Sequence, residues 1–283
     1  MKRLRISAIS YLNTAPLMWD FEHGNASLSE TRSYFDISYT IPSECAASLR
    51  DGSADIGIIP AAAYISIPDL AIVPGVAIAS RRAVRSILLV SKVPLERIQT
   101  VALDTSSMTS VALTKVLFAK WWGGNRKFTA MAPDIEQMLE LHDAGLVIGD
   151  PALKIDRSRY VTYDLAEEWI GFTGKPFVFA FWAVRQASLK DAPHDLDLAA
   201  VFQKSRDHGL LPENLNRIAC QWAPRVGLSQ EQIKTYLTEN ICYFLDPACL
   251  DGMHLFYQLA RECGALPAAP PLGFLDAAKA AVT

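Results

Sequence analysis

The sequence PFVFAFWAVR, at residues 176–185, decides the fold that we expect for this chain. It is an apolar and aromatic run that follows a single proline, which is typical of a strand buried on both faces. Strand and helix patterns alternate before this run, and only helix patterns follow it. We therefore expect this strand to bring the chain back from a second α/β lobe to a first lobe that the N-terminal residues began.

The chain before this strand reads as two series of alternating strands and helices. The first series has expected strands at 4–9, 35–41, 54–59, 71–79 and 84–91, and expected helices at 15–22 and 43–50, with Ser43 as N-cap and Gly52 at the C-terminal end. The second series has strands at 101–103 and 146–149 and helices at 107–122 and 135–144. The restart of the pattern indicates a second lobe, and each series reads as βαβ units with a parallel sheet.

Helices are expected throughout the part of the chain after residue 185, because apolar residues recur there at three- and four-residue spacing. Their ranges are 196–207, 212–222, 229–245 and 247–263. The whole pattern predicts two α/β lobes joined by a pair of hinge strands, with a helical C-terminal segment. Such an architecture closes on a ligand in its cleft. We expect residues 1–84 and 183–283 to form the first lobe, which is discontinuous, and residues 85–182 to form the second.

The composition points to a small-molecule partner in the cytoplasm. The 283 residues carry a net charge of −3, and no basic block follows KRLR at 2–5, so we expect neither nucleic acid nor an anionic membrane as partner. No apolar stretch approaches the length that spans a bilayer, and the N-terminal segment lacks the apolar run of a signal peptide. The five cysteines have no CxxC spacing, which argues against a disulfide framework and a zinc site. The sequence favours no particular oligomeric state.

Four segments follow predicted strands, at the edge where open α/β sheets bind ligands. They are SYLNTAP at 10–16, IPAAAY at 59–64, LDTSSMTS at 103–110 and IGDPAL at 148–153. The third places hydroxyl groups and free backbone N–H groups at one helix start, which suits a carboxylate. A plainer interpretation stays open for three of them: helix capping for LDTSSMTS and IGDPAL, and an ordinary loop for SYLNTAP.

The familiar cofactor motifs are missing from this sequence. It contains neither GxGxxG nor GxxxxGK[ST], and its five histidines have neither HxH nor HExxH spacing, so we expect no nucleotide cofactor and no metal. The segment SRRAVRS at 80–86 brings three arginines to the first predicted hinge strand. It is either a solvated basic turn or a place where Ser86 or one of Arg81, Arg82 and Arg85 points into the cleft.

Six segments together resemble the chorismate dehydratases of the futalosine route to menaquinone. They are ISYLNTAPL at 9–17, DIGIIP at 55–60, VRSILLVSK at 84–92, LDTSSMTSVAL at 103–113, GLVIGDPAL at 145–153 and DLAEEWIGFTGKPFVFAFWAVR at 164–185, in the same order and over roughly the first two thirds of the chain. The resemblance implies a type II periplasmic-binding-protein-like fold. It also implies a carbon–oxygen lyase that removes water from chorismate, a small dianionic substrate, to form 3-[(1-carboxyvinyl)oxy]benzoate.

A related enzyme of the same pathway offers an alternative function. In 1,4-dihydroxy-6-naphthoate synthase the first strand leads into a histidine-containing, HSPD-like segment, whereas this chain reads YLNT at 11–14. This difference favours the dehydratase. The synthase activity and a non-catalytic small-molecule binding protein remain the alternatives.

The expected site rests on this resemblance and on the chemistry of its residues. Amides and hydroxyls are weak bases, but they can orient a substrate and donate hydrogen bonds to developing charge. We therefore expect the enolpyruvyl carboxylate of the substrate to remove the ring proton. The candidate loops supply only two carboxylates, Asp104 and Asp150, and Asp150 stays open as the alternative base. The expected catalytic residues are Asn13 and Ser86; the expected substrate-binding residues are Tyr11, Thr14, Thr105, Ser106, Ser107, Thr109, Gly149 and Asp150; no cofactor and no metal are expected.

Overall fold

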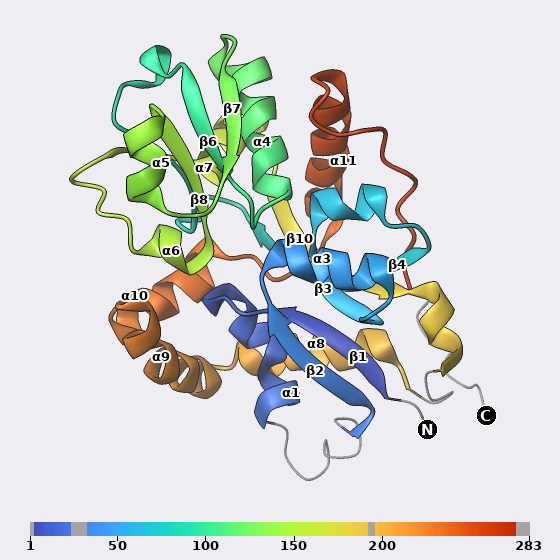
Figure 1. Ribbon diagram of the computed structural model, residues 1–283. Coiled ribbons are helices and arrows are strands. Elements are labelled where there is room, and N and C mark those ends of the chain that lie inside the picture. The colour runs from blue at the N-terminus through green and yellow to red at the C-terminus, as the bar shows by residue number, and fades with distance from the viewer. Residues whose placement is uncertain (1–2, 24–32, 192–195, 276–283) are drawn as a thin grey trace.

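Two five-stranded sheets, each covered by helices, form the protein in the computed structural model, which describes residues 3–23, 33–191 and 196–275. Figure 1 shows one sheet in the lower half of the molecule and the other in the upper half. The lower sheet has the order β2-β1-β3-β10-β4, with β1 Leu4–Ile9, β2 Phe35–Thr40, β3 Ile56–Pro60, β4 Leu70–Ser80 and β10 Phe177–Arg185. The upper sheet has the order β7-β6-β8-β5-β9, with β5 Ile87–Ser91, β6 Thr100–Asp104, β7 Lys127–Met131, β8 Ala144–Ile148 and β9 Val161–Asp164. The predicted α/β class is confirmed.

Both sheets are mixed, whereas the strand and helix pattern predicted parallel sheets. Strands β1, β2 and β3 are parallel, as are β6, β7 and β8, but β10 runs antiparallel to β3 and β4, and β5 runs antiparallel to β8 and β9. The reason is the route of the chain, which leaves the lower sheet after β4 and re-enters it through β10. A strand that enters from the other sheet arrives in the opposite direction.

The helices of the lower half differ in detail from the predicted ones. The expected helix at 15–22 is divided into a 3-10 helix, η1 Leu12–Met18, and a short α-helix, α1 Trp19–His23. Pro16 lies inside η1 and lacks the N–H group that an α-helix needs there. In α3 Pro42–Asp51 the N-cap is Ile41, so the predicted cap Ser43 is wrong, whereas Gly52 ends the helix in the left-handed conformation as expected. A 3-10 helix, η3 Ala61–Ser66, follows β3.

The upper half contains three elements that the sequence pattern did not indicate: β7, β9 and α7 Leu165–Thr173. Both missed strands are edge strands, so their side chains alternate weakly between buried and exposed. The other helical segments are η4 Leu95–Arg97, α4 Thr109–Leu117, the π-helix η5 Phe118–Trp122, α5 Ile135–Leu141 and α6 Gly149–Leu153. Helix α5 ends before the predicted residue 144, because Ala144 already begins β8.

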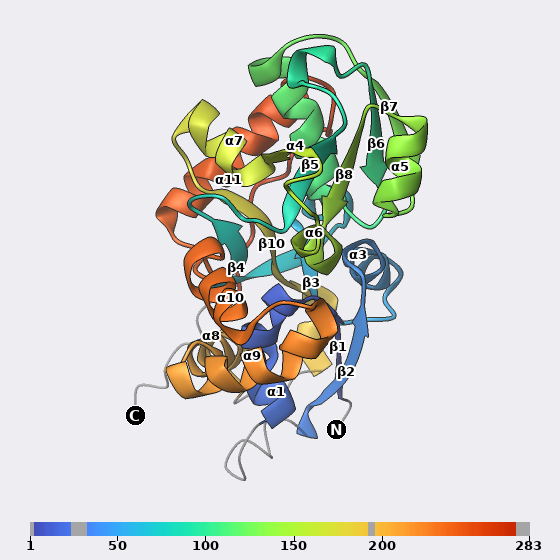
Figure 2. The ribbon, with the colours of Figure 1, turned by 90° about the vertical axis from the view of Figure 1, so that its left-hand side faces the viewer.

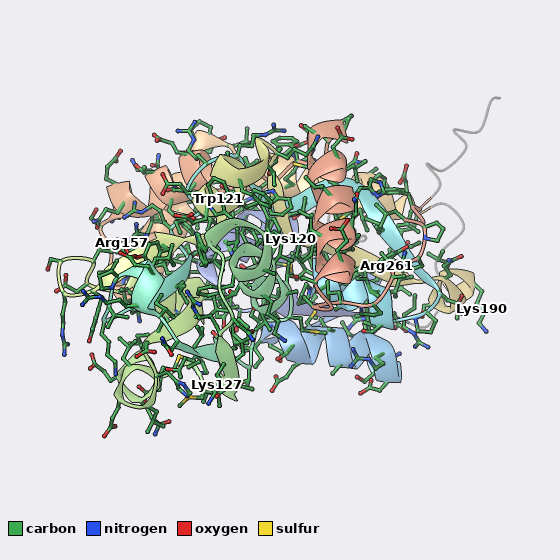
Figure 3. The ribbon with its side chains drawn as sticks, turned by 90° about the horizontal axis from the view of Figure 1, so that it is seen from above. Lys120, Trp121, Lys127, Arg157, Lys190 and Arg261 are labelled. Atoms are coloured by element: carbon green, nitrogen blue, oxygen red, sulfur yellow. The ribbon has the colours of Figure 1, made fainter. Side chains whose placement is uncertain are left out.

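The C-terminal segment is helical and returns to both halves. Its elements are η6 Gln186–Asp191, α8 Leu198–Gly209, α9 Pro212–Val226, α10 Gln230–Thr235, the π-helix η7 Tyr236–Asn240 and α11 Pro247–Glu262. Helix α8 packs on the lower sheet, where the rings of Phe202 and Trp182 lie 4.7 Å apart. Helix α11 rises beside the upper sheet (Figure 2). Lys120 of η5, which is labelled in Figure 3, forms an ion pair of 2.8 Å with Glu262 of α11. Within the described residues, no helix combines the length and apolar character needed to cross a membrane.

The predicted helix at 229–245 ends early. After Asn240 the chain is extended, and Cys242 forms an antiparallel bridge with Ala79 of β4. Asn240 also donates a 2.8 Å hydrogen bond to the carbonyl of Ala83, in the segment where the chain passes from β4 to β5. The C-terminal segment therefore holds the crossing between the two sheets.

Candidate functional site

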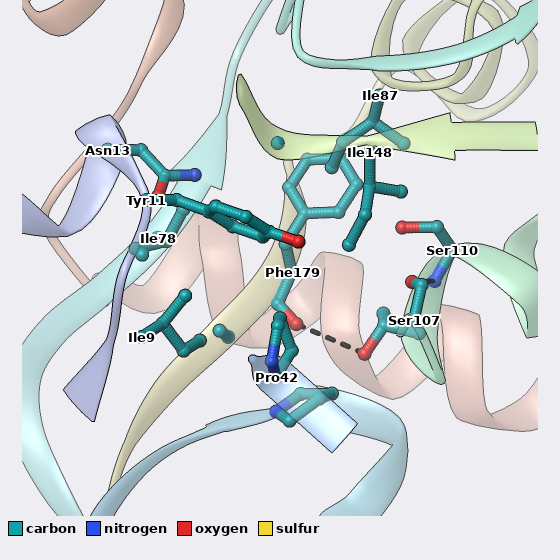
Figure 4. Close-up of a pocket in the computed structure, with 14 residues that line it drawn as sticks. Ile9, Tyr11, Asn13, Pro42, Ile78, Ile87, Ser107, Ser110, Ile148 and Phe179 are labelled. Atoms are coloured by element: carbon teal, nitrogen blue, oxygen red, sulfur yellow. Dashed lines mark hydrogen bonds between the residues drawn. The ribbon is translucent and has the colours of Figure 1, made fainter. Parts of the chain in front are cut away.

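A pocket lies between the two sheets and is lined from both of them. Figure 4 shows its 14 lining residues, which are Ile9, Tyr11, Asn13, Pro42, Pro60, Ile78, Ile87, Ser107, Thr109, Ser110, Ile148, Gly149, Phe179 and Ala180. Five residues expected in the site line this pocket: Tyr11, Asn13, Ser107, Thr109 and Gly149. Ser86 does not line it, although its neighbour Ile87 does.

The aromatic ring of Tyr11 reaches across from the lower half to Gly149 of α6. Gly149 has φ +67°, and a Cβ atom placed on it would lie 2.6 Å from the ring of Tyr11, so only glycine fits this approach. The hydroxyl of Tyr11 points toward the side of the pocket formed by Ile148 and Ser110 (Figure 4). Burial raises the pKa of the Tyr11 phenol, so this group is a neutral donor rather than a base near neutral pH.

Asn13 and Ser86, the two expected catalytic residues, meet through Tyr236. The hydroxyl of Tyr236 donates a 2.8 Å hydrogen bond to Oγ of Ser86, and its side chain also contacts the amide of Asn13. Ser86 and Tyr236 are fully buried, whereas Asn13 faces the pocket (Figure 4). The buried Ser86–Tyr236 pair therefore lies next to Asn13 but does not itself line the pocket.

Tyr236 is the residue that the sequence did not indicate. It lies in η7, within a stretch whose apolar spacing reads as an ordinary packed helix, so its aromatic ring suggested only core packing. A tyrosine that is buried completely needs a hydrogen-bond partner for its hydroxyl, and this is the one signal that could have singled it out.

The hydroxyl groups at the start of α4 have different roles. Ser107 and Ser110 line the pocket, and Oγ of Ser107 accepts a 3.2 Å hydrogen bond from the N–H of Ser110. Thr109 also lines the pocket, but its hydroxyl is already engaged: it donates to the carbonyl of Phe179 at 3.1 Å (dashed in Figure 4) and accepts from the N–H of Ala62 at 3.1 Å. Ser107 and Ser110 are thus the groups best placed to contact a ligand.

Two residues of the same segment lie away from the pocket. Thr105 is exposed to solvent and does not line the pocket. Ser106 is buried, and its N–H and hydroxyl both donate to Oδ1 of Asp104, at 2.8 and 2.6 Å. The other carboxylate oxygen of Asp104 accepts from the N–H of Ile148 at 3.3 Å. Asp104 therefore stabilises the loop between β6 and α4, and burial raises the pKa of its carboxyl group.

Asp150 and Thr14 line a second pocket, which shares Ile9 and Tyr11 with the first. Oδ1 of Asp150 accepts a 3.0 Å hydrogen bond from the N–H of Leu12 in the lower half. Burial raises the pKa of Asp150 to about 6, although the Leu12 N–H group and Lys154 act in the opposite direction.

Three strand ends of the lower sheet donate backbone N–H groups to the upper half. After β1, the N–H of Leu12 bonds Asp150; after β2, the N–H of Ser43 bonds the carbonyl of Ser106 at 3.2 Å. After β3, the N–H of Ala62 bonds the hydroxyl of Thr109. These three bonds join the two halves around the pocket.

The three arginines after β4 do not line the pocket. Ser86, in the same segment, accepts the hydrogen bond from the hydroxyl of Tyr236. Arg81 forms an ion pair with Asp246, and Arg82 lies 4.0 Å from Glu239. The backbone N–H of Arg85 donates to Asp164 at 2.6 Å.

The pocket offers neutral hydrogen-bond donors in an otherwise apolar wall. Its described lining residues include no lysine, arginine, histidine, aspartate or glutamate. Among the residues with described positions, no group of three or more histidine, cysteine, aspartate or glutamate side chains could hold a metal ion. Such a site can bind, orient and polarise a ligand, but its own side chains are poor general bases near pH 7.

Comparison with known proteins gives both a family match and structural relatives. The family described as menaquinone biosynthesis matches residues 4–262. A chorismate dehydratase from Thermus thermophilus is 28% identical over an alignment of 254 positions, which covers 83% of this chain and 89% of that protein. The crystal structure of protein AF1704 from Archaeoglobus fulgidus has a TM-score of 0.73 at 17% identity and covers 93% of this chain and 98% of its own. The periplasmic aliphatic sulphonate binding protein of Escherichia coli has a TM-score of 0.64 at 16% identity, with coverage of 98% and 94%. The expected periplasmic-binding-protein-like fold is thereby confirmed.

Proposed function

Because the chain belongs to the menaquinone biosynthesis family, we propose that it is a chorismate dehydratase, a carbon–oxygen lyase that converts chorismate into 3-[(1-carboxyvinyl)oxy]benzoate and water. The observation that carries this proposal is the pocket between the sheets, which presents neutral donors from both halves and no protein base. The similarity to the Thermus thermophilus chorismate dehydratase supports the same substrate.

The chemistry of the substrate fits a site of this kind. Chorismate loses a ring proton and the neighbouring hydroxyl group, and the product ring is aromatic, so the enzyme has chiefly to lower the barrier to deprotonation. A site without a base can do so if it holds the enolpyruvyl carboxylate of the substrate against the ring C–H. That carboxylate then takes the proton, the C–H electron pair enters the ring, and the ring C–O bond breaks to release hydroxide, which leaves as water with the proton.

The roles of the side chains follow from their positions. Asn13, backed by Tyr236 and Ser86, holds the enolpyruvyl carboxylate in the reactive conformation. Ser107 and Ser110, at the start of α4, bind the ring carboxylate, because hydroxyl groups and a helix N-terminus both favour an anion. The apolar wall excludes water, which strengthens each of these hydrogen bonds.

The lobes and the location of the enzyme belong to the same proposal. Residues 1–84 with 183–283, and residues 85–182, are the two bodies that close on the substrate, and the three N–H bonds from the lower strand ends form when they close. The enzyme acts in the cytoplasm without a cofactor or a metal.

The experiment is a direct assay of product formation. The purified protein is incubated with chorismate, without added metal or cofactor, and products are followed by chromatography with mass detection. We expect a product lighter by one water. Asn13→Ala should slow its formation by about 10²-fold or more, as the loss of a donor that acts in the transition state does.

A matched pair of variants tests the support behind Asn13. Tyr236→Phe removes the hydroxyl that reaches Ser86, whereas Thr238→Ala removes an exposed hydroxyl of the same helix η7. We expect a slower reaction only for Tyr236→Phe. Chorismate that binds but is returned unchanged would contradict the proposal and leave a binding protein, and turnover of the naphthoate precursor instead would identify the synthase.

A further inference from the structure

One buried carboxylate joins the start of α7 to the segment in which the chain passes from β4 to β5. Asp164 is 5% exposed, and its Oδ1 atom caps α7 by accepting from the N–H groups of Ala166 and Glu167, at 3.1 and 3.3 Å. Oδ1 also accepts from the N–H of Val84 at 3.0 Å, and Oδ2 accepts from the N–H of Arg85 at 2.6 Å. A helix cap needs only the first two bonds, so the other two hold the crossing segment.

Arg85 has a backbone conformation that is unfavourable for a residue with a Cβ atom. Its φ of +63° lies in the left-handed region, and among the described residues Asp69, with φ +56°, is the one other such residue that is not glycine. A conformation of this kind persists only where its surroundings hold it. Asp164 binds the N–H of Arg85, and Arg157 donates to the carbonyl of Arg85 at 3.2 Å. The two contacts hold the left-handed residue on both sides.

The conformation of Arg85 determines where the next residue, Ser86, is placed. Ser86 is fully buried, and its carbonyl accepts a 2.7 Å hydrogen bond from the N–H of Gly149, which lines the pocket. Its hydroxyl accepts the bond from Tyr236, and the following residue, Ile87, lines the pocket. A change of backbone angle at residue 85 therefore moves groups in the wall of the pocket.

We propose that Asp164 is a positioning residue for the reaction of this pocket. Its carboxylate holds residues 84 and 85 in the conformation that places Ser86 and Gly149 for the dehydration of chorismate. Asp164 does not line the pocket, so it acts through the backbone of the crossing segment and not by contact with the substrate. The inference rests on the proposed function.

The test compares Asp164→Asn with a second capping variant in the full chain. Asparagine caps helices about as well as aspartate, but its NH2 group cannot accept from the N–H of Arg85. We expect kcat for chorismate to fall roughly 10- to 100-fold, with a much smaller change in KM, because misplaced site groups orient the substrate poorly. The control is Asp134→Asn, since Asp134 caps α5 by accepting from the N–H of Gln137 at 3.1 Å. It should leave kcat unchanged.

A second substitution separates positioning from a loss of stability. Arg85→Gly removes the cost of the left-handed conformation and keeps the N–H of residue 85, so in the Asp164→Asn background it should restore kcat roughly 10-fold. Asp69→Gly relieves strain of the same kind at the start of β4 and should restore nothing. Arg85→Val leaves Asp164 intact but disfavours the left-handed conformation further, so it should lower kcat even if Asp164→Asn does not fold. Thermal unfolding checks that each variant is folded.

Hydrogen exchange of the Gly149 N–H gives a readout that does not need the reaction. Its bond to the carbonyl of Ser86 should weaken in Asp164→Asn and in Arg85→Val, so exchange should be faster in both and unchanged in Asp134→Asn. If the wild type leaves chorismate unchanged, the proposed function fails, and this exchange still tests the placement of Ser86. Equal kcat and exchange in the two capping variants, or restoration by Asp69→Gly as large as by Arg85→Gly, would overturn the role of Asp164.

Discussion

Replacing Gly149 with alanine should hinder closure of the two halves, in addition to the backbone strain that it adds within the upper half. The substitution has two costs: a left-handed backbone at φ +67°, and a Cβ atom 2.6 Å from the Tyr11 ring. Gly174→Ala is the matched control, because Gly174 has φ +70° and its added Cβ meets nothing within 4 Å. The left-handed conformation costs about 1–2 kcal/mol in both variants, so both should lose similar thermal stability from this cause.

The clash with the Tyr11 ring is a cost that Gly149→Ala has and Gly174→Ala lacks. Overpacking of this kind costs roughly 1–3 kcal/mol, and it is relieved when the two halves separate. Since 1.4 kcal/mol is a factor of ten, kcat/KM for chorismate should fall roughly 10- to 100-fold in Gly149→Ala and much less in Gly174→Ala.

Hydrogen exchange gives a second readout that does not depend on the reaction. The N–H of Leu12 is bonded to Asp150 across the pocket, so its exchange should accelerate in Gly149→Ala and stay unchanged in Gly174→Ala. If the two variants behave alike in both measurements, Tyr11 does not rest on Gly149 in the working protein, and the reasoning fails.

Three further outcomes are expected. The pKa of Asp150 is about 6 in the folded protein and near 4 in the unfolded chain, so between these values the folded protein holds a proton that the unfolded chain has lost. The free energy of unfolding should therefore fall by up to about 3 kcal/mol as pH rises from 4 to 6. Asp150→Asn should flatten this pH dependence in thermal melts. Thr109→Val leaves the N–H of Ala62 unpaired and should cost roughly 1–3 kcal/mol in urea unfolding, whereas Thr109→Ser should recover most of it. Tyr236→Phe leaves Ser86 without its donor and should lower stability by about 1 kcal/mol, with no effect from Thr238→Ala.

The order of the elements could be predicted from the sequence because buried strands are apolar runs with clear ends. The strand expected at 4–9 is found as Leu4–Ile9, and the run at 176–185 is found as Phe177–Arg185. The edge strand Lys127–Met131 escapes this reasoning, since none of its residues is buried and it therefore carries no apolar run. Strand direction also escapes it, because direction depends on where the chain enters the sheet.

The site could be predicted only in outline. A polar segment after a strand indicates the correct edge of a sheet, and Tyr11, Asn13 and Ser107 do line the pocket. The pattern cannot tell which hydroxyl of a row faces a ligand, and Thr105 points to solvent while its neighbours are buried. Nor can it join Ser86 to Tyr236, which lie 150 residues apart along the chain. The roles assigned to Asn13 and Ser86 stay predictions.

The three N–H bonds that join the halves restrict the amino acids on the two sides of the pocket to different degrees. The donors at Leu12, Ser43 and Ala62 are main-chain groups, so almost any residue except proline can occupy these positions and still bond the other half. Two of the acceptors, Asp150 and Thr109, are side chains and have no such latitude. Leu12 and Ala62 are buried, so packing also restricts these two positions. As far as the bonds themselves are concerned, a scan of all substitutions should find that the lower half excludes only proline, whereas the upper half needs the acceptor side chains of Asp150 and Thr109.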